Sequence, residues 1–229
     1  GVLVHSGIWY SIVFHFTDSM LACLTNTAPW YGPLAEQGDA DAQINLAWLS
    51  ENNGIAEVDP DPSCVAKWYS LAAEQGHPEA QLRLGAIYDS GRWGRAEDTT
   101  QAVHWWHKAA LQGHRGAQMR LADMLMRGRG AERNEAEALK WIRKAAEQSD
   151  LEAIHLMAVA HAEGRGVAKD LGAALKWCER GAELGHVELQ FRWGVHLFAA
   201  EGVQRDVRRS AAVLRQAAEA GHVGAQLNL

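Results

Sequence analysis

The 229-residue sequence predicts an all-α protein built from antiparallel helix pairs that repeat about every 36 residues. Three observations lead to this fold class. The chain has 39 alanines and 5 prolines, a composition that favours helices, and its 22 glycines indicate that the helices end often. Tryptophans recur at a nearly constant spacing, and two short motifs recur in step with them.

Tryptophan shows the period. Successive intervals of 38, 37, 36 and 36 residues separate Trp30, Trp68, Trp105, Trp141 and Trp177. A further 36 residues leads to Val213, an apolar residue in the same phase. Each position is followed by a motif close to Ala-Glu-Gln-Gly, as in residues 73–76, and then by one close to His-x-x-Ala-Gln-x-x-Leu-Gly, as in residues 77–85. Two motifs in step over five periods indicate true internal repeats.

Each period holds two helices, which we name helix A and helix B. Helix A begins after the motif glycine and ends at glycine-rich turns such as 128–130 and 164–166, where glycine suits the residue just past a helix end. Helix B begins near an N-cap such as Asp170 or Asp206 and ends at the next motif. The tryptophans of helix B are expected to form the core together with one phase of helix A, which contains Leu84, Leu121, Met157 and Trp193.

These motifs resemble the Sel-like repeat family, a subclass of the tetratricopeptide-like α-solenoids. Also similar are Gly-Arg-Gly-Val-x-Lys-Asp at 164–170 and Ala-Leu-Lys-Trp at 138–141 and 174–177. The resemblance covers residues 30–229 and implies a right-handed superhelical α-solenoid of antiparallel helix pairs. It also implies an adaptor role, and bacterial members of the family are often periplasmic or secreted. The cysteine-rich branch joins its helix pairs by phased disulfides, which this chain lacks.

The chain divides into two predicted segments. Residues 30–229 form the solenoid: the trailing helix of a divergent first unit, five repeats, and a partial repeat that stops within a helix at Leu229. Residues 1–29 are apolar and predict a packing or capping helix; a targeting or membrane segment and an artificial leader are the alternatives. Asp18 interrupts the apolar run, and no basic residue precedes it. Membrane contact is therefore expected only if this segment is a targeting sequence, and the periplasmic or secreted and the cytoplasmic compartments both stay open.

Charge and cysteine usage exclude several classes. The first 66 residues carry eight acidic and no basic side chains, whereas the other 163 carry 22 basic and 20 acidic ones. A nucleic-acid binder would need a basic footprint, and none is evident. The three cysteines, Cys23, Cys64 and Cys178, are too few and too scattered for a disulfide framework, and at least one is unpaired in a monomer.

The sequence predicts no catalytic site, no metal and no cofactor. Four histidines share one repeat phase beside the turn glycine, which predicts a turn or capping role: His77, His114, His186 and His222. His104 and His107 have a spacing that can hold a metal, but no further ligand lies in phase with them. The acidic loop around 59–61 has no calcium-loop spacing, and no Gly-x-Ser-x-Gly motif or neighbouring Cys–His pair is present.

The exposed face of helix A predicts a partner-binding surface, because helix A lines the concave side of a solenoid. Counted from the motif glycine, offsets 3, 7, 10 and 14 lie opposite the apolar face. The candidate residues on this face are Asn45, Trp48, Arg83, Arg120, Asp123, Arg127, Leu156, Val159 and Arg192. Arginine binds carboxylates in a bidentate manner. Glu79 and Glu188, however, precede two of these arginines by four residues and would form stabilising pairs within the helix, whereas Arg120 and Arg127 lack such a Glu.

The sequence therefore predicts a non-enzymatic scaffold or adaptor that binds a protein or peptide segment in the concave groove. Three arginines, Arg83, Arg120 and Arg192, occupy offset 7 of their repeats, and such a row of hydrogen-bond donors indicates an acidic or C-terminal carboxylate group on the partner. A cell-wall-related enzyme and a purely structural assembly subunit are the alternatives. An enzyme would show a deep pocket with clustered His, Cys or carboxylate groups, and a scaffold would show an open groove without them.

Overall fold

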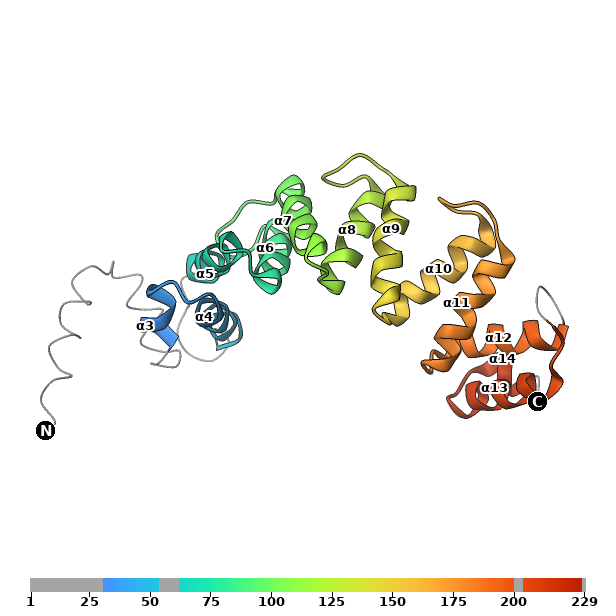
Figure 1. Cartoon of the computed structure of the whole chain (residues 1–229). Helices are drawn as coiled ribbons and strands as arrows, with labels where there is room; N and C mark the ends of the chain where they lie inside the picture. Colours follow the sequence, from blue (N-terminus) through green and yellow to red (C-terminus); the bar gives the residue numbers. More distant parts are fainter. Residues whose placement is uncertain (1–30, 54–61, 200–203, 228–229) are drawn as a thin grey trace, which may run out of the picture. The chain divides into compact units, whose positions relative to one another are not determined.

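The computed structural model describes residues 31–53, 62–199 and 204–227, and all regular structure in these ranges is α-helical (Figure 1). The helices are α3 (Tyr31–Glu36), α4 (Ala40–Asn53), α5 (Pro62–Glu74), α6 (Pro78–Ser90), α7 (Thr99–Leu111), α8 (Arg115–Arg127), α9 (Glu135–Glu147), α10 (Leu151–Glu163), α11 (Leu171–Glu183), α12 (Val187–Ala199), α13 (Val207–Glu219) and α14 (Val223–Leu227). The all-α fold class is confirmed. The segment 1–29 and the acidic loop at 59–61 lie outside the described residues.

The chain forms two compact units, residues 1–112 and residues 113–229. In the first unit α3 packs on α4, α4 on α5, α5 on α6 and α6 on α7. In the second unit each helix from α8 to α13 packs on the helix that follows it. Within each unit every helix thus contacts its sequence neighbours, which is the packing of a helical repeat protein. No helix of the described ranges has both the length and the apolar character needed to span a membrane.

The predicted helix boundaries are confirmed by their caps. The side chains of Asp170 and Asp206 accept hydrogen bonds from the backbone N–H three residues later, at 3.0 and 2.9 Å. Gly128 and Gly164 end α8 and α10 in the left-handed conformation, which glycine adopts without steric cost. These local signals give each long helix from α5 to α13 the same length of 13 residues.

The helix-B core is shifted by one residue from the predicted tryptophan series. Trp68 and Trp141 are buried, but Trp105 and Trp177 are only half-buried. The position after the tryptophan, or after Val213 in the last pair, is buried in the five helix pairs from α5 on, at Tyr69, Trp106, Ile142, Cys178 and Leu214. The helix-A phase is buried as predicted, at Leu84, Leu121, Met157 and Trp193. The tryptophan series is therefore part of the core at Trp68 and Trp141, whereas at Trp105 and Trp177 it lies at the edge of the helix interface.

At two helix interfaces a large side chain on one helix packs directly against a glycine on the other. Trp106 is 2% exposed and donates its indole N–H to the carbonyl of Leu82 at 3.0 Å. A Cβ added at Gly85 would lie 2.5 Å from the Trp106 indole nitrogen, so this glycine is required by its large neighbour. Likewise, a Cβ at Gly181 would lie 2.1 Å from Leu189 Cδ1, in the pair where leucine replaces the alanine of the other repeats.

Glutamines of the two motifs bond successive helix pairs together. The helix-A glutamines Gln43 and Gln81 are buried and donate to the carbonyls of Ala35 and Ala73, at 2.9 and 3.1 Å. The glutamine that ends the following helix B donates to the side-chain oxygen of the helix-A glutamine, at 2.8–3.0 Å, in the pairs Gln75–Gln43, Gln112–Gln81 and Gln148–Gln118. We call these bonds the glutamine rungs. One rung is replaced by two apolar residues, Ile154 and Leu184.

Candidate functional site

The predicted binding residues of the first unit lie on α4 and α6. Asn45 is exposed, and Trp48 is 49% exposed, which is unusual for so large an apolar side chain. Arg83 is half-buried and pairs with Glu79 at 2.8 Å. Arg83 thus forms the pair within its own helix that the spacing of Glu79 and Arg83 predicted.

Arg83 also belongs to a polar group that joins three helices. The Tyr69 hydroxyl of α5 donates to Glu51 of α4 at 3.1 Å, and burial, followed by the charge of Glu51, raises the pKa of Tyr69. The hydrogen bond to Glu79 raises the pKa of Arg83 despite its partial burial, with Tyr69 and Glu51 adding to the effect. Because its guanidinium is already engaged, Arg83 is a poor anchor for a partner.

The second unit positions the three predicted residues of α8 on its outer surface. Arg127 lacks a Glu partner, as expected, but it pairs with Asp123 at 2.7 Å instead. The i,i+4 spacing of these two predicted residues explains the pair. Arg120 is exposed and forms no ion pair with any residue that the structure describes. Arg120 is therefore the predicted arginine that is most available for a partner's carboxylate.

Leu156 and Val159 of α10 are half-buried and line an open pocket of about 210 Å³. Met126, which is 36% exposed, adds to the apolar wall. The remaining lining residues are Arg133, Glu135, Leu139, Ile142, Ala160 and Arg165. The pocket therefore has an apolar floor from α9 and α10 and two arginines at its edge, as a segment with an apolar anchor and acidic flanks would require.

Arg192 of α12 is held by a polar network that connects α12 to the turn before α14. Glu188 accepts from Arg192 at 2.7 Å and lies 3.0 Å from the Nε2 atom of His222. Burial alone would raise the pKa of Glu188, but the hydrogen bonds from Arg192 and His222 outweigh it and lower this pKa. Like Arg83, Arg192 has a structural role that competes with partner binding.

The predicted turn histidines act as helix N-caps. The Nδ1 atoms of His114, His186 and His222 accept hydrogen bonds from the backbone N–H three residues later, at 3.3, 3.3 and 3.1 Å. His77 has no such bond, and its Nε2 atom instead lies 3.3 Å from Asp41. The capping role is thus confirmed for three of the four histidines.

The described residues offer little for catalysis. No three His, Cys, Asp or Glu side chains among them are grouped so that they could hold a metal ion. Cys178 is a free, buried thiol whose pKa burial raises to about 11, and a protonated thiol is a poor nucleophile. Burial, with the charges of Arg192 and His186, lowers the pKa of His155.

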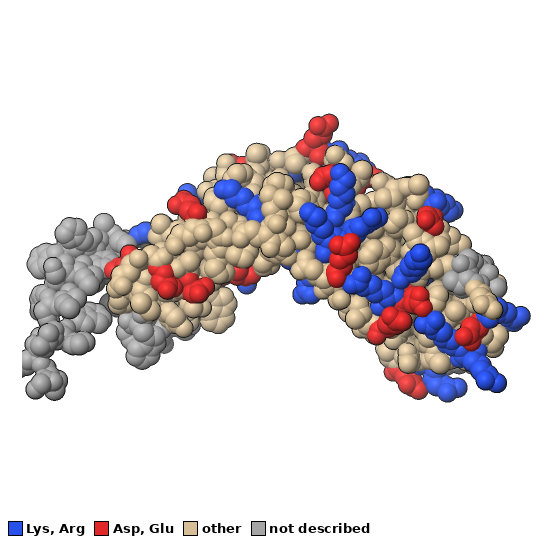
Figure 2. Space-filling view, in the orientation of Figure 1, with Lys and Arg blue, Asp and Glu red and all other residues tan. Residues whose placement is uncertain are grey.

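Basic side chains are concentrated in the second half of the chain. Residues 113–229 carry 17 Lys and Arg against 15 Asp and Glu, whereas residues 1–112 carry 5 against 13. Figure 2 shows Lys and Arg side chains distributed over the helices of the second unit. The second unit is therefore the better surface for an acidic partner.

Comparison with known proteins identifies the repeats. The Sel1 repeat model matches residues 40–77, 78–114, 116–150, 151–186 and 187–222. No curated protein matches the chain. A similar solved structure is c5321, described as a protective antigen of uropathogenic Escherichia coli with this repeat fold; it shares 35% identity at a TM-score of 0.76, over 88% of this chain and 42% of that one. A Sel1 repeat protein from Oxalobacter formigenes shares 30% identity at a TM-score of 0.71, over 86% of this chain and 56% of that one. The chain thus spans about half the length of these relatives.

Proposed function

Because the chain belongs to the Sel1 repeat family, whose members generally bind other proteins, we propose that it is a non-catalytic scaffold for a protein or peptide segment. The segment binds the second unit along the exposed face of α8 and α10, the helix-A face that is predicted to line the concave side. An acidic or C-terminal carboxylate pairs with Arg120, and an apolar side chain enters the pocket of Leu156 and Val159.

The pocket at Leu156 and Val159 is the observation that carries this proposal. Both residues occupy positions where a solvated helix face would have polar side chains, and both line a hollow rather than a filled core. Apolar contacts supply affinity, and the charged groups around them supply orientation. Arg133 and Arg165, at the pocket edge, are engaged with Glu135 and Glu163 but keep exposed side chains.

Site-specific crosslinking tests the proposal. A photo-crosslinking residue at the position of Arg120 should capture the partner from an extract of the source organism. The same residue at Arg143, which is exposed on α9, is the matched control and should capture nothing specific. Equal capture from both positions would contradict the proposed surface.

Charge reversal then measures how much the arginines of this surface contribute to the binding free energy. Arg120→Glu combined with Arg127→Glu should weaken binding of the captured partner by about 2 kcal/mol, roughly 30-fold, if both contacts are desolvated. Arg143→Glu combined with Lys176→Glu changes the net charge equally at two exposed positions and should change binding little. Lys144 is unsuitable for this control because its ammonium stacks on Trp141 at 4.1 Å. Loss of binding in the control alone would place the working surface on helix B.

A further inference from the structure

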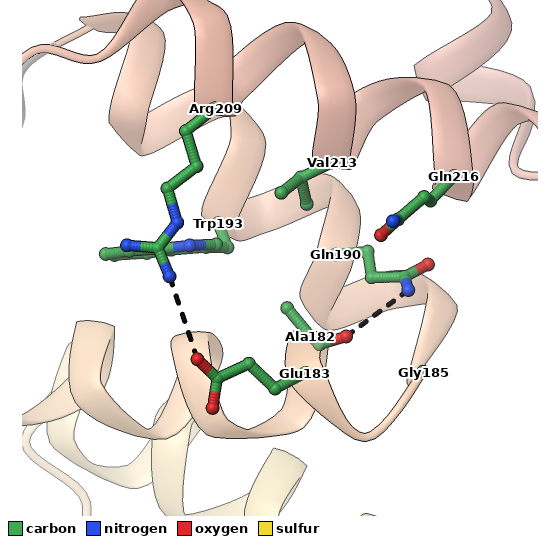
Figure 3. Close-up of a pocket in the computed structure, with 8 residues that line it drawn as sticks. All are labelled: Ala182, Glu183, Gly185, Gln190, Trp193, Arg209, Val213 and Gln216. Atoms are coloured by element: carbon green, nitrogen blue, oxygen red, sulfur yellow. Dashed lines mark hydrogen bonds and ion pairs between the residues drawn. The ribbon is translucent and has the colours of Figure 1, made fainter.

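A second pocket, of about 460 Å³, lies between α11, α12 and α13 (Figure 3). Its lining residues are Ala182, Glu183, Gly185, Gln190, Trp193, Arg209, Val213 and Gln216. Figure 3 shows the Arg209 guanidinium against the Trp193 ring and directed toward Glu183, with Gln190 and Gln216 at the other end. The guanidinium carbon lies 5.6 Å from the ring centroid, and Arg209 pairs with Glu179 at 2.9 Å.

The pocket lies where earlier repeats have a tryptophan and a cation. Val213 holds the phase of Trp105, Trp141 and Trp177, and Gln216 holds the phase of the cation stacked on each of them. Those cations lie 4.3, 4.1 and 5.7 Å from their rings and belong to Lys108, Lys144 and Arg180. Trp193 replaces the smaller Met157 of the preceding repeat and supplies an aromatic wall, while Val213 and Gln216 replace the tryptophan and the cation that stack on each other in the earlier helices B.

The same pocket lacks its glutamine rung. Gln190 donates to the Ala182 carbonyl at 3.3 Å, as the equivalent glutamines do, but Ala220 stands where the next helix B would supply the donating glutamine. The Gln190 side-chain oxygen therefore accepts no hydrogen bond from any described residue. At the other missing rung both partners are apolar, Ile154 and Leu184, so no acceptor is left over there. An acceptor without a donor in a hollow favours a ligand that brings an N–H group.

Charge at the pocket favours an acidic ligand. Helix α13 carries Arg208, Arg209 and Arg215 and no acidic residue before Glu219. Arg208 and Arg215 are exposed and form no ion pair within the described part of the chain. Neither lines the pocket, but at 100° per residue both lie on one flank of α13, so an acidic residue on that side of an inserted group would meet positive charge.

We propose that this pocket receives the indole of a tryptophan from an acidic peptide segment of a partner protein. The indole occupies the place of the missing tryptophan beside Trp193 and Val213, and its N–H donates to the Gln190 side-chain oxygen. Buried aromatic anchors of this kind dominate the energy of protein interfaces. The inference rests on the proposed scaffold function but concerns a separate site on α11–α13.

The probe is the peptide acetyl-Asp-Glu-Trp-Glu-Asp-amide, titrated into the full chain and followed by calorimetry and amide NMR. We expect saturable binding, with shifts at Val213 and at the Gln190 side-chain amide. A peptide methylated on the indole nitrogen should bind about fivefold more weakly, because it loses one hydrogen bond. A peptide with leucine in place of tryptophan should bind more weakly still. Absence of binding, or equal binding of the tryptophan and leucine peptides, would overturn the proposal.

Val213→Trp supplies the chain's own indole and should abolish peptide binding. Ala212→Trp places the same residue at an adjacent exposed position outside the pocket lining and should leave binding unchanged. Should Val213→Trp reduce the helical circular dichroism, Gln190→Leu replaces it: this variant should remove the difference between the free and methylated indole peptides. Undiminished binding to Val213→Trp, or a difference that persists in Gln190→Leu, would refute the assignment.

The two proposals fail separately. Charge reversal on α8 should not alter peptide binding at α11–α13, and Val213→Trp should not alter binding at the pocket of Leu156 and Val159. A concentration-dependent dimer in size-exclusion chromatography that Val213→Trp dissociates would mean that a second copy fills the pocket, and this would overturn the peptide assignment.

Discussion

Replacement of Gly181 by alanine tests whether the close packing of this glycine of α11 against Leu189 of α12 stabilises the fold. Most other repeats have alanine at this helix-B position, as at Ala109 and Ala145, and alanine at the facing helix-A position, as at Ala117. Here the pair is Gly181 and Leu189. Leu189 is 0% exposed, and a Cβ at Gly181 would lie 2.1 Å from its Cδ1 atom.

The magnitude follows from two opposed effects. Alanine in a helix is about 1 kcal/mol more favourable than glycine. Overpacking a filled interface costs about 1–3 kcal/mol. The added methyl would also lie 3.1 Å from Ile154 Cγ2, so neither neighbour can move away freely. Gly181→Ala should therefore lower the free energy of unfolding by about 1 kcal/mol.

Leu189→Ala removes the side chain with which the added methyl clashes. In that background the effect of Gly181→Ala on the free energy of unfolding should change sign. Alone, Leu189→Ala should cost about 2–5 kcal/mol because it leaves a cavity. Added to that variant, Gly181→Ala should stabilise by up to about 1 kcal/mol, since it restores the alanine pair of the other repeats. The assay is urea unfolding of all four proteins followed by circular dichroism, with hydrogen exchange to localise the change. Should Gly181→Ala stabilise both backgrounds alike, Leu189 does not fill the space that the structure assigns to it.

Three further predictions concern the core, pH and metals. Trp141 is 5% exposed, so Trp141→Ala should cost about 3–5 kcal/mol in chemical denaturation; a melting curve equal to that of the wild type would contradict its burial. Glu188 has a pKa below its ordinary value of 4.5, so its contribution to stability is complete above that value and is lost as the pH falls through the folded-state pKa. The stability difference between wild type and Glu188→Gln, measured by denaturation from pH 7 to about 3, should shrink in acid; a constant difference would argue against the network with Arg192 and His222. EDTA should alter neither the melting temperature nor partner binding, because no described group of side chains is arranged to hold a metal; a purified sample with stoichiometric zinc would show otherwise.

Local signals in the sequence predicted the helix pairs and their boundaries well. Asp170, Asp206, Gly128 and Gly164 cap the helices that their positions predicted. These signals are local because a cap needs only its own turn.

The centre of the core was less predictable. Adjacent tryptophans offered two phases at residues 105 and 106, and the repeat spacing favoured the half-buried one. Burial of Trp106 depends on Gly85, which lies 21 residues earlier, and no periodicity within one helix shows this.

The candidate site could be predicted only as a set of positions. The offset count placed Leu156 and Val159 on the outer face of α10, but the pocket beside them also needs Met126 and Leu139 from α8 and α9. The pairing of Arg127 with Asp123 was readable from their spacing, because residues four apart meet on a helix. The hydrogen bonds between glutamine side chains could not be predicted in this way, since the bonded residues are 30 to 32 positions apart.

The histidine caps fix a tautomer at three of the turns. An Nδ1 atom that accepts a backbone N–H carries no proton, so His114, His186 and His222 hold their hydrogen on Nε2. These imidazoles cap their helices without placing a positive charge at the N-terminal end of the helix dipole, where it would be unfavourable. Asp39 and Asp150 cap with oxygens that are negative when ionised, at 2.8 and 3.0 Å. The repeats thus combine neutral and anionic caps, and dissolved salt, which screens charge, should weaken the aspartate caps more than the histidine caps.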